Sequence, residues 1–239
     1  MKIVQPKVRY ITELDGEKML LLIQQIAKNC YQTRKITDDI DSAKRIVKSL
    51  IQSGHHSMLE FVNIIVEIDT NISGYKDCRT HRHSTWAVES SRFCNYSKGR
   101  FGEEISFLDP IEFPDKNSEL YKKWKETMLL IEKNYIEMAK LGATPDQLSL
   151  LLPQSTKGTA VVSANLREWR HILSLRSSVA ATGHARPSIV SLMDEILETF
   201  HSKIPIVFDD LYEQMKINQM KKQHNLINKQ VINTKEKTK

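Results

Sequence analysis

A short polar stretch, residues 80–93, holds the side chains of this chain that are best suited to chemistry. It reads Thr-His-Arg-His-Ser-Thr-Trp-Ala-Val-Glu-Ser-Ser-Arg-Phe, with two imidazoles and two guanidinium groups among hydroxyls and very few aliphatic residues. Arginine presents a rigid fork of donors that fits phosphate or carboxylate, and neutral histidine both donates and accepts hydrogen bonds. The stretch therefore predicts a site for an anionic, nucleotide-like ligand. The alternative is a solvated basic surface, which is the more common role of a lone run of charges.

Two other blocks carry polar side chains close together. Residues 54–60 read Gly-His-His-Ser-Met-Leu-Glu, and residues 165–171 read Asn-Leu-Arg-Glu-Trp-Arg-His. Ser57 and Glu60 have the spacing of a helix capping box. Asn165 precedes an apolar helical pattern and is expected to be its N-cap.

Arg176 allows an argument from helix geometry alone. If residues 166–176 form an α-helix, one face is apolar and Arg176 falls within that face, whereas Arg170 falls outside it. The apolar positions are Leu166, Trp169, Ile172 and Leu173. An inward-facing arginine needs a partner, because an unpaired buried charge costs several kcal/mol. A bound ligand and the last carbonyls of the helix are both open as that partner.

The three blocks, in this order, resemble the conserved motifs of the flavin-dependent thymidylate synthases. Residues 80–90 resemble that family's Arg-His-Arg signature followed by seven residues and Ser, with Thr80 in place of the first arginine. Residues 89–98 resemble its Glu-Ser-Thr-Arg-Tyr-Cys-Asn-Tyr-Ser-Lys run. Residues 54–60 and 165–176 resemble its Gly-His-x-Ser-x-Leu-Glu element and its C-terminal block. The resemblance spans roughly residues 1–205.

The resemblance implies an α+β fold of the thymidylate synthase-complementing type, with a central mixed sheet and flanking helices. It implies an enzyme, a methyltransferase that converts dUMP to dTMP. Methylenetetrahydrofolate would be the carbon donor and FAD reduced by NADPH the hydride source. The family is homotetrameric, with sites shared between subunits. Two alternatives are open: a relative that acts on another pyrimidine nucleotide, for example by hydroxymethylation, and a non-catalytic relative that binds flavin or nucleotide.

The resemblance also implies roles for single residues. The cofactor-binding residues would be Ser57, Thr80, His81, Arg82, Asn165, Leu166, Arg167 and His171. The substrate-binding residues would be Asp77, Arg79, Glu89, Ser90, Ser91, Arg92 and Arg176. Of these, Arg176 would act catalytically by contacting the pyrimidine and favouring ionisation of its N3, and no metal is expected. Thr80, Val88 and Ser149 stand where the family's motifs or their surroundings carry other polar or charged residues, so contacts there are expected to be altered.

Periodicity predicts the elements that must position these residues. Helices are expected at 17–29, 42–51, 118–141, 166–176 and 187–201, a short helix after Gly54, strands at 61–68 and 156–164, and a loop at 109–117. Gly142 is expected to end the long helix. The chain has no Gly-rich phosphate loop, so a Rossmann domain is disfavoured.

Composition fits one globular domain at 1–215 and a basic tail at 216–239 that is a frayed helix or disordered. The tail holds seven lysines and one glutamate, which accounts for the whole net charge of +6, so nucleic-acid binding is not expected. No apolar run is long enough to span a membrane, and the N-terminus lacks a signal sequence. The 3 cysteines have no metal-ligand spacing and indicate reduced thiols in a cytoplasmic protein.

Overall fold

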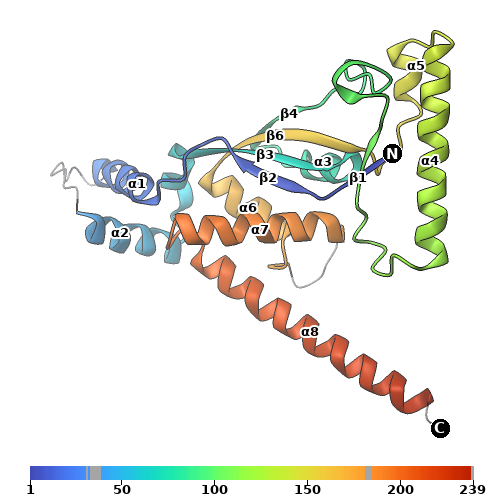
Figure 1. Cartoon of the computed structure of the whole chain (residues 1–239). Coiled ribbons are helices and arrows are strands. Elements are labelled where there is room, and N and C mark those ends of the chain that lie inside the picture. The colour runs from blue at the N-terminus through green and yellow to red at the C-terminus, as the bar shows by residue number, and fades with distance from the viewer. Residues whose placement is uncertain (31, 33–38, 181–184, 238–239) are drawn as a thin grey trace. The chain divides into compact units, whose positions relative to one another are not determined.

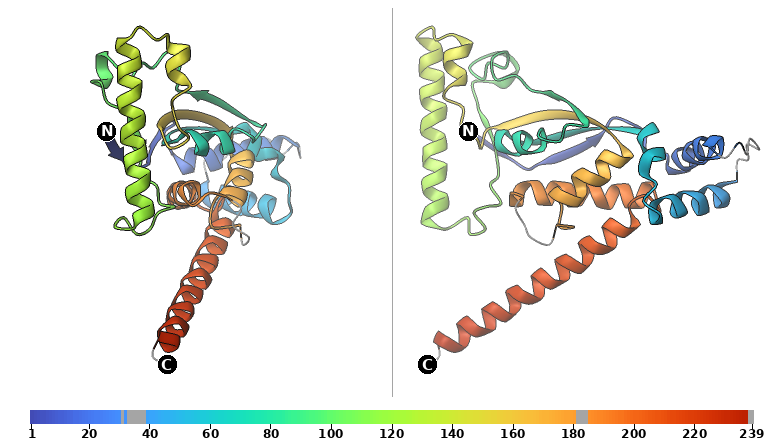
Figure 2. Two further views of the ribbon diagram at one scale, coloured as in Figure 1. Left: turned by 90° about the vertical axis from the view of Figure 1, so that its right-hand side faces the viewer. Right: turned by 180° about the vertical axis from the view of Figure 1, so that it is seen from behind.

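The computed structural model describes residues 1–30, 32, 39–180 and 185–237. Its internal contacts divide the chain into two compact units. The first unit consists of Met1–Thr12 and Ile65–Ser163, and the second of Glu13–Ile64 and Ala164–Lys239. Figures 1 and 2 show the elements of both, which mix helices and strands and confirm the α+β class.

A four-stranded sheet dominates the first unit, with the order β2-β3-β6-β4. Its strands are β2 (Lys7–Tyr10), β3 (Asn63–Asn71), β6 (Lys157–Asn165) and β4 (Ser84–Val88). Strands β2 and β3 are antiparallel, whereas the separate pair β1 (Lys2–Val4) and β5 (Ser106–Leu108) is parallel. The parallel pair thus lies in a separate sheet from the antiparallel β2–β3 pair.

Strand β6 has one buried face and one partly exposed face, because alternate side chains of a strand point to opposite sides. Gly158, Ala160 and Val162 lie on the buried face. A Cβ at Gly158 would lie 2.7 Å from the ring of Tyr75, so the small residue permits close packing there. Lys157 and Thr159 lie on the other face, where polar side chains gather.

Four helices complete the first unit: α3 (Ile72–Cys78), η2 (Gly99–Phe101), α4 (Glu119–Lys140) and α5 (Pro145–Ser149). The predicted helix at 118–141 is confirmed as α4, which Ser118 caps through Tyr121 N. Gly142 follows with a φ of +89°, a left-handed conformation that glycine adopts without strain. A cluster of six buried side chains forms the core around α4: Tyr96, Ile105, Phe107, Met128, Tyr135 and Leu148.

The second unit is helical, with α1 (Gly16–Cys30), α2 (Ile40–Gln52), η1 (His56–Phe61), α6 (Leu166–Arg176), α7 (Pro187–Lys203) and α8 (Asp209–Lys237). The predicted helices at 17–29, 42–51, 166–176 and 187–201 are confirmed within one to three residues at their ends. The core contains Trp169 and Phe200 at 5.2 Å between ring centroids, with Phe208 5.1 Å beyond Phe200. A Cβ at Gly16 would lie 2.1 Å from the carbonyl oxygen of Lys203, so only glycine fits where α1 begins.

Two local predictions are corrected. The strand expected at 61–68 is β3, which begins two residues later, because η1 occupies the chain as far as Phe61. The capping box of Ser57 and Glu60 is wrong: His55 is the N-cap of η1 and makes no side-chain cap hydrogen bond. Ser57 lies inside the short helix, and Glu60 pairs with Arg167 instead.

Helix α8 continues to Lys237, through most of the segment expected to be a tail. Its residues 216–219 contact other parts of the second unit. Lys216 Nζ lies 2.5 Å from Glu198 Oε1, and Asn218 Nδ2 donates to the carbonyls of Ser178 and Val179 at 3.0 and 2.9 Å. Among the described residues, no helix combines the length and apolar character that crossing a bilayer requires.

Candidate functional site

Five predicted site residues of the first unit, from Asp77 to Arg82, follow one another around the end of α3. The Thr80 hydroxyl donates to the Asp77 carbonyl at 2.8 Å, and Ser84 Oγ donates to the His81 carbonyl at 2.7 Å. These bonds fold the chain into a tight turn before β4. His81 is buried, whereas Arg79 and Arg82 are exposed. Both guanidinium groups are therefore accessible, as binding an anion requires.

Glu89 begins the second group of predicted residues, at the end of β4. Its backbone N–H donates to the Thr159 carbonyl at 2.8 Å, and Thr159 N donates back to Glu89 Oε2 at 3.1 Å. The Tyr96 hydroxyl donates to Glu89 Oε1 at 3.0 Å. Burial and the adjacent Glu89 carboxylate raise the pKa of Tyr96, so the phenol keeps the proton that it donates. Glu89 is thus fixed on both oxygens.

The residues after Glu89 form a tight turn that presents Arg92 to solvent. The N–H groups of Phe93 and Cys94 donate to the Ser90 carbonyl at 3.1 and 2.9 Å. Arg92, the predicted phosphate contact, forms a two-pronged ion pair with Asp146 in the first turn of α5. Both side chains are about two-thirds exposed, and such pairs contribute little to stability because water screens them. An anionic ligand could therefore displace Asp146 at small cost.

In the second unit, the blocks at 54–60 and 165–171 meet. The Leu166 N–H donates to the Val62 carbonyl at 2.9 Å, and Arg167 Nη1 lies 2.5 Å from Glu60 Oε1. Asn165 caps α6 by accepting from Glu168 N at 2.8 Å, as predicted. Ser57 of η1 and Arg167 in the first turn of α6 are both exposed, so their hydroxyl and guanidinium groups are accessible to a ligand.

Two of the three arginines of α6, Arg170 and Arg176, correct the prediction from helix geometry. Arg170, expected to lie outside the apolar face, is the buried one at 8% exposure, whereas Arg176 is only partly buried. Arg170 makes a two-pronged ion pair with Asp210 at 2.8 and 2.6 Å, and it also donates to the Val207 carbonyl. The reason is that the first turn of α8 covers this side of α6, which a helix considered alone cannot reveal.

Arg170 also controls the ionisation of its partner. Burial acts to raise the pKa of Asp210, but the hydrogen bonds and the positive charge of Arg170 outweigh burial and hold that pKa below its ordinary value. This pair is therefore structural. His171 directly follows Arg170 in α6, and its side chain is exposed and accessible to a ligand.

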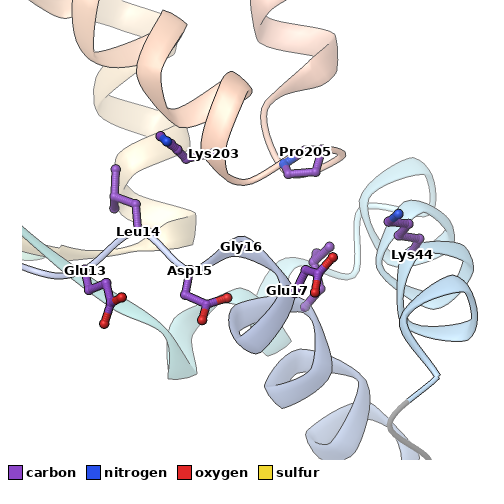
Figure 3. Close-up of a pocket in the computed structure, with 9 residues that line it drawn as sticks. Glu13, Leu14, Asp15, Gly16, Glu17, Lys44, Lys203 and Pro205 are labelled. Carbon is purple, nitrogen blue, oxygen red and sulfur yellow. The ribbon is translucent and has the colours of Figure 1, made fainter.

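A cavity of about 420 Å³ lies in the second unit beside the first turn of α1, as Figure 3 shows. Its walls mix three carboxylates and two lysines: Glu13, Leu14, Asp15, Gly16, Glu17, Leu20, Lys44, Lys203 and Pro205. None of these residues belongs to the three sequence blocks. No cluster of three or more side chains suited to holding a metal occurs in the described part of the chain.

Several polar residues near the candidate site were not predicted from the sequence. They are Asp69, Asp146, Lys157, Thr159 and Asp210. The sequence does contain a pattern that points to Lys157 and Thr159, because these polar residues alternate with the small residues of β6. Asp146 and Asp210 become relevant only through partners more than 35 residues away in sequence.

Comparison with known proteins extends these observations. The family model of the thymidylate synthase complementing protein matches residues 15–206. Flavin-dependent thymidylate synthases of Pyrococcus abyssi and Thermococcus onnurineus are 28% and 32% identical over 158 and 145 residues, which is 65% and 60% of this chain. These alignments cover 63% and 58% of the relatives, so the chain spans less than two thirds of either one.

A solved structure shares the fold. The UMP/dUMP methylase PolB from Streptomyces cacaoi, bound with 5-Br dUMP, superposes with a TM-score of 0.70 at 16% identity, covering 91% of this chain and 97% of that one. The family match covers most of the residues described above, including all three blocks. The chain therefore belongs to the thymidylate synthase complementing protein family.

Proposed function

We propose that this protein is a flavin-dependent thymidylate synthase, which methylates dUMP to dTMP with methylenetetrahydrofolate as carbon donor and NADPH as reductant. The observation that carries the proposal is the junction of η1 and α6. There two sequence blocks about a hundred residues apart are joined by the Arg167–Glu60 ion pair, and Asn165 caps the start of α6. Ser57 belongs to the same short helix η1 as Glu60. Family membership and the relatives named above support the same activity.

The residues at this junction fit a flavin nucleotide by the chemistry of their donors. Arg167 is 55% exposed, Ser57 presents a hydroxyl, and the N-terminus of a helix favours phosphate. The neighbouring His56 Nε2 is buried with no hydrogen-bond partner among the described residues. FAD bound there would supply the hydride. The chain's share would be to orient the ring system, through Asn165, Leu166, Arg167 and His171 in the second unit. Thr80, His81 and Arg82 of the first unit are proposed as flavin contacts in the same subunit or in a neighbouring one.

The nucleotide would be held by a second set of residues. Arg79 and Arg92 are exposed cations that suit its phosphate, while Ser90 and Ser91 offer hydroxyls and Asp77 an acceptor. Arg176 would contact the pyrimidine and stabilise negative charge at N3 as the ring reacts. This role needs an accessible guanidinium, and Arg176 is partly exposed at the end of α6. Cys78 is fully buried, so it is not suited to act as a nucleophile.

We also propose a cytoplasmic homotetramer whose sites are completed by a neighbouring subunit. Light scattering on the purified protein is expected to give a tetramer that takes up FAD. A monomer that takes up no flavin at saturating FAD would contradict this part of the proposal.

The activity is tested by a spectrum and an assay on the same preparation. After incubation with FAD and removal of the excess, the protein is expected to be yellow. With methylenetetrahydrofolate it should oxidise NADPH only when dUMP is added, and mass spectrometry should find dTMP. Parallel reactions with UMP and dCMP serve as specificity controls. A product formed from one of these alone, or a hydroxymethylated product, would replace the proposal with a different pyrimidine modification.

A further inference from the structure

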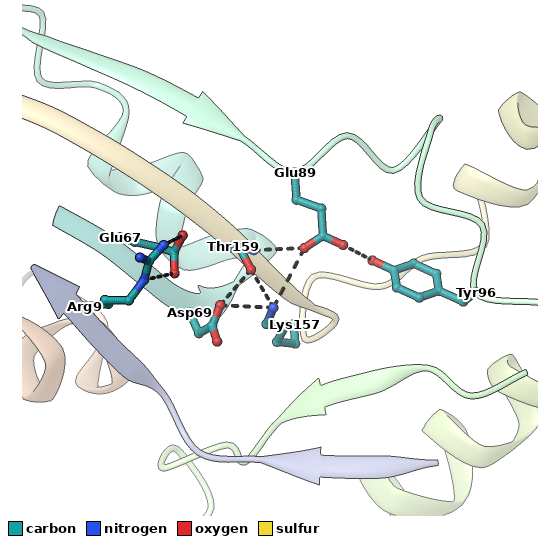
Figure 4. A network of polar contacts seen from close by, with 7 residues as sticks. All are labelled: Arg9, Glu67, Asp69, Glu89, Tyr96, Lys157 and Thr159. Carbon is teal, nitrogen blue, oxygen red and sulfur yellow. Dashed lines mark hydrogen bonds and ion pairs between the residues drawn. The ribbon is translucent and has the colours of Figure 1, made fainter. Parts of the chain in front are cut away.

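A group of five polar residues joins three strands on the partly exposed face of the sheet, as Figure 4 shows. We call it the Lys157 network: Asp69, Glu89, Tyr96, Lys157 and Thr159. Lys157 Nζ lies 3.0 Å from Asp69 Oδ1, 2.5 Å from Thr159 Oγ1 and 3.9 Å from Glu89 Oε2. Thr159 Oγ1 also lies 2.7 Å from Asp69 Oδ1. One ammonium group therefore stands between two carboxylates.

The network is sheltered enough for its charges to matter. The side chains of Glu89, Lys157 and Asp69 are 16%, 23% and 27% exposed. Electrostatic interactions are stronger at such sites than on the open surface, because less water screens them. Without Lys157, two carboxylates would face each other with no cation between them.

Other titratable groups surround the network. The Arg9–Glu67 ion pair joins β2 to β3 on the same face, with distances of 2.9 and 2.7 Å. Tyr75 and Arg79 of α3 interact electrostatically with each other, and Tyr75 also with Glu89. Tyr96 donates to Glu89 from the loop that follows. Of these groups, only Lys157 provides a cation near both Asp69 and Glu89.

Glu89 connects the network to the predicted nucleotide site. It directly precedes Ser90, Ser91 and Arg92, and its backbone and side chain both bond to Thr159. The position of its carboxylate therefore sets where this segment leaves β4. A shift of Glu89 away from Asp69 would move the segment with it.

We propose that Lys157 is a positioning residue for the nucleotide-binding segment, acting by holding the Glu89 carboxylate beside Asp69. The inference rests on the proposed function, since it takes dUMP as the ligand of Ser90, Ser91 and Arg92. Lys157 acts through Glu89 and is not assigned a contact with the nucleotide.

The main test replaces Lys157 by Met, which keeps length and removes charge. Lys157→Met is expected to weaken dUMP binding about tenfold at pH 8 and to leave FAD affinity within about twofold. The two carboxylates then repel each other with no cation between them, which moves Glu89 and the segment that follows it.

Two further variants separate charge from packing. Asp69→Asn combined with Lys157→Met restores the original net charge of the group and is expected to recover most of the dUMP affinity. Lys157→Arg keeps the charge and should bind dUMP nearly as tightly as the wild type. Arg9→Met is the matched control, because it breaks an ion pair on the same face that does not touch Glu89; it should leave dUMP binding unchanged.

Each result decides the inference. If Lys157→Met binds dUMP as tightly as the wild type, Lys157 is not a positioning residue. The same follows if the variant loses dUMP, FAD and thermal stability together and the double variant recovers none of them. If the wild type itself binds no dUMP, the proposed function fails and this inference fails with it. The two failures are distinguishable by the wild-type titration alone.

Discussion

Two arginines of the candidate site are held by carboxylates of the chain itself. Arg92 pairs with Asp146, and Arg167 pairs with Glu60. These pairs are largely exposed and individually weak, but they keep long side chains extended in one direction. A phosphate group that replaces the carboxylate then meets a guanidinium that is already oriented.

This arrangement predicts an effect of Asp146. Asp146→Asn is expected to tighten dUMP binding about two- to fivefold, because Arg92 no longer has to leave an ion pair. Glu119→Gln is the matched control, since Glu119 also stands in the first turn of an exposed helix and pairs with a cation, Lys122. Titration with dUMP measures both. Equal tightening in the two variants would indicate a general charge effect rather than release of Arg92.

Arg176 gives the second prediction. Arg176→Ala is expected to weaken dUMP binding or turnover at least about tenfold, because a hydrogen bond to a charged group is worth about 1.5–3 kcal/mol. FAD affinity should be largely spared, and Arg176→Lys should restore the function only in part, since an ammonium lacks the planar fork. FAD affinity, dUMP affinity and melting temperature are measured on each variant. Joint loss of flavin and stability would point to a structural role.

Sequence alone predicted single residues well where the cause was local. Asn165 caps α6 because it stands directly before the helix, and Gly142 ends α4 for a similar reason. The buried arginine of α6 was assigned wrongly because Asp210, its partner, is 40 residues away. The network around Lys157 was missed for the same reason, since Asp69 and Glu89 come from other strands.

At the level of elements, long periodic segments were predictable and short ones were not. Helices α1, α2, α4, α6 and α7 show a clear apolar stripe, so their positions were anticipated. Strands β1 and β5 have 3 residues each and are defined by pairing with each other across about a hundred residues, which leaves almost no local pattern. Helix α3 was missed because its 7 residues follow β3 without a break in composition.

The contact of α8 with α6 makes a prediction about pH. The folded-state pKa of Asp210 is lowered, so its contribution to stability is present above the ordinary pKa and is lost as the pH falls through the folded-state value. Asp210→Asn should therefore be less stable than the wild type at pH 6, with a gap in melting temperature that closes between about pH 5 and pH 2.

Thermal denaturation across this range measures the gap. Glu213→Gln, which changes an exposed carboxylate on the same helix, is the control and should show no such convergence. A gap for Asp210→Asn that stays constant with pH would mean that the side chain stabilises through packing rather than through its charge.

At the scale of the whole chain, two truncations test how much the basic C-terminal segment contributes to stability. Removal of residues 222–239 should change the melting temperature by less than about 2 °C, because the contacts at Lys216, Asn218 and Gln219 are kept. Removal of residues 216–239 loses these contacts and should lower it by several degrees. FAD binding should survive both. Equal destabilisation by the two truncations would place the important contacts beyond residue 221.

Each unit is built from two segments that are far apart in the chain, and this affects how the protein folds during synthesis. Residues 13–64 lie in the same unit as residues 164–239, which are synthesised about a hundred residues later. Among the described residues of that unit, the fully buried aromatic side chains, Trp169, Phe200 and Phe208, all come from the later segment. The start of α1, where Gly16 lies against the carbonyl oxygen of Lys203, therefore stays without this partner while the intervening residues are made, an interval in which chaperones could bind it.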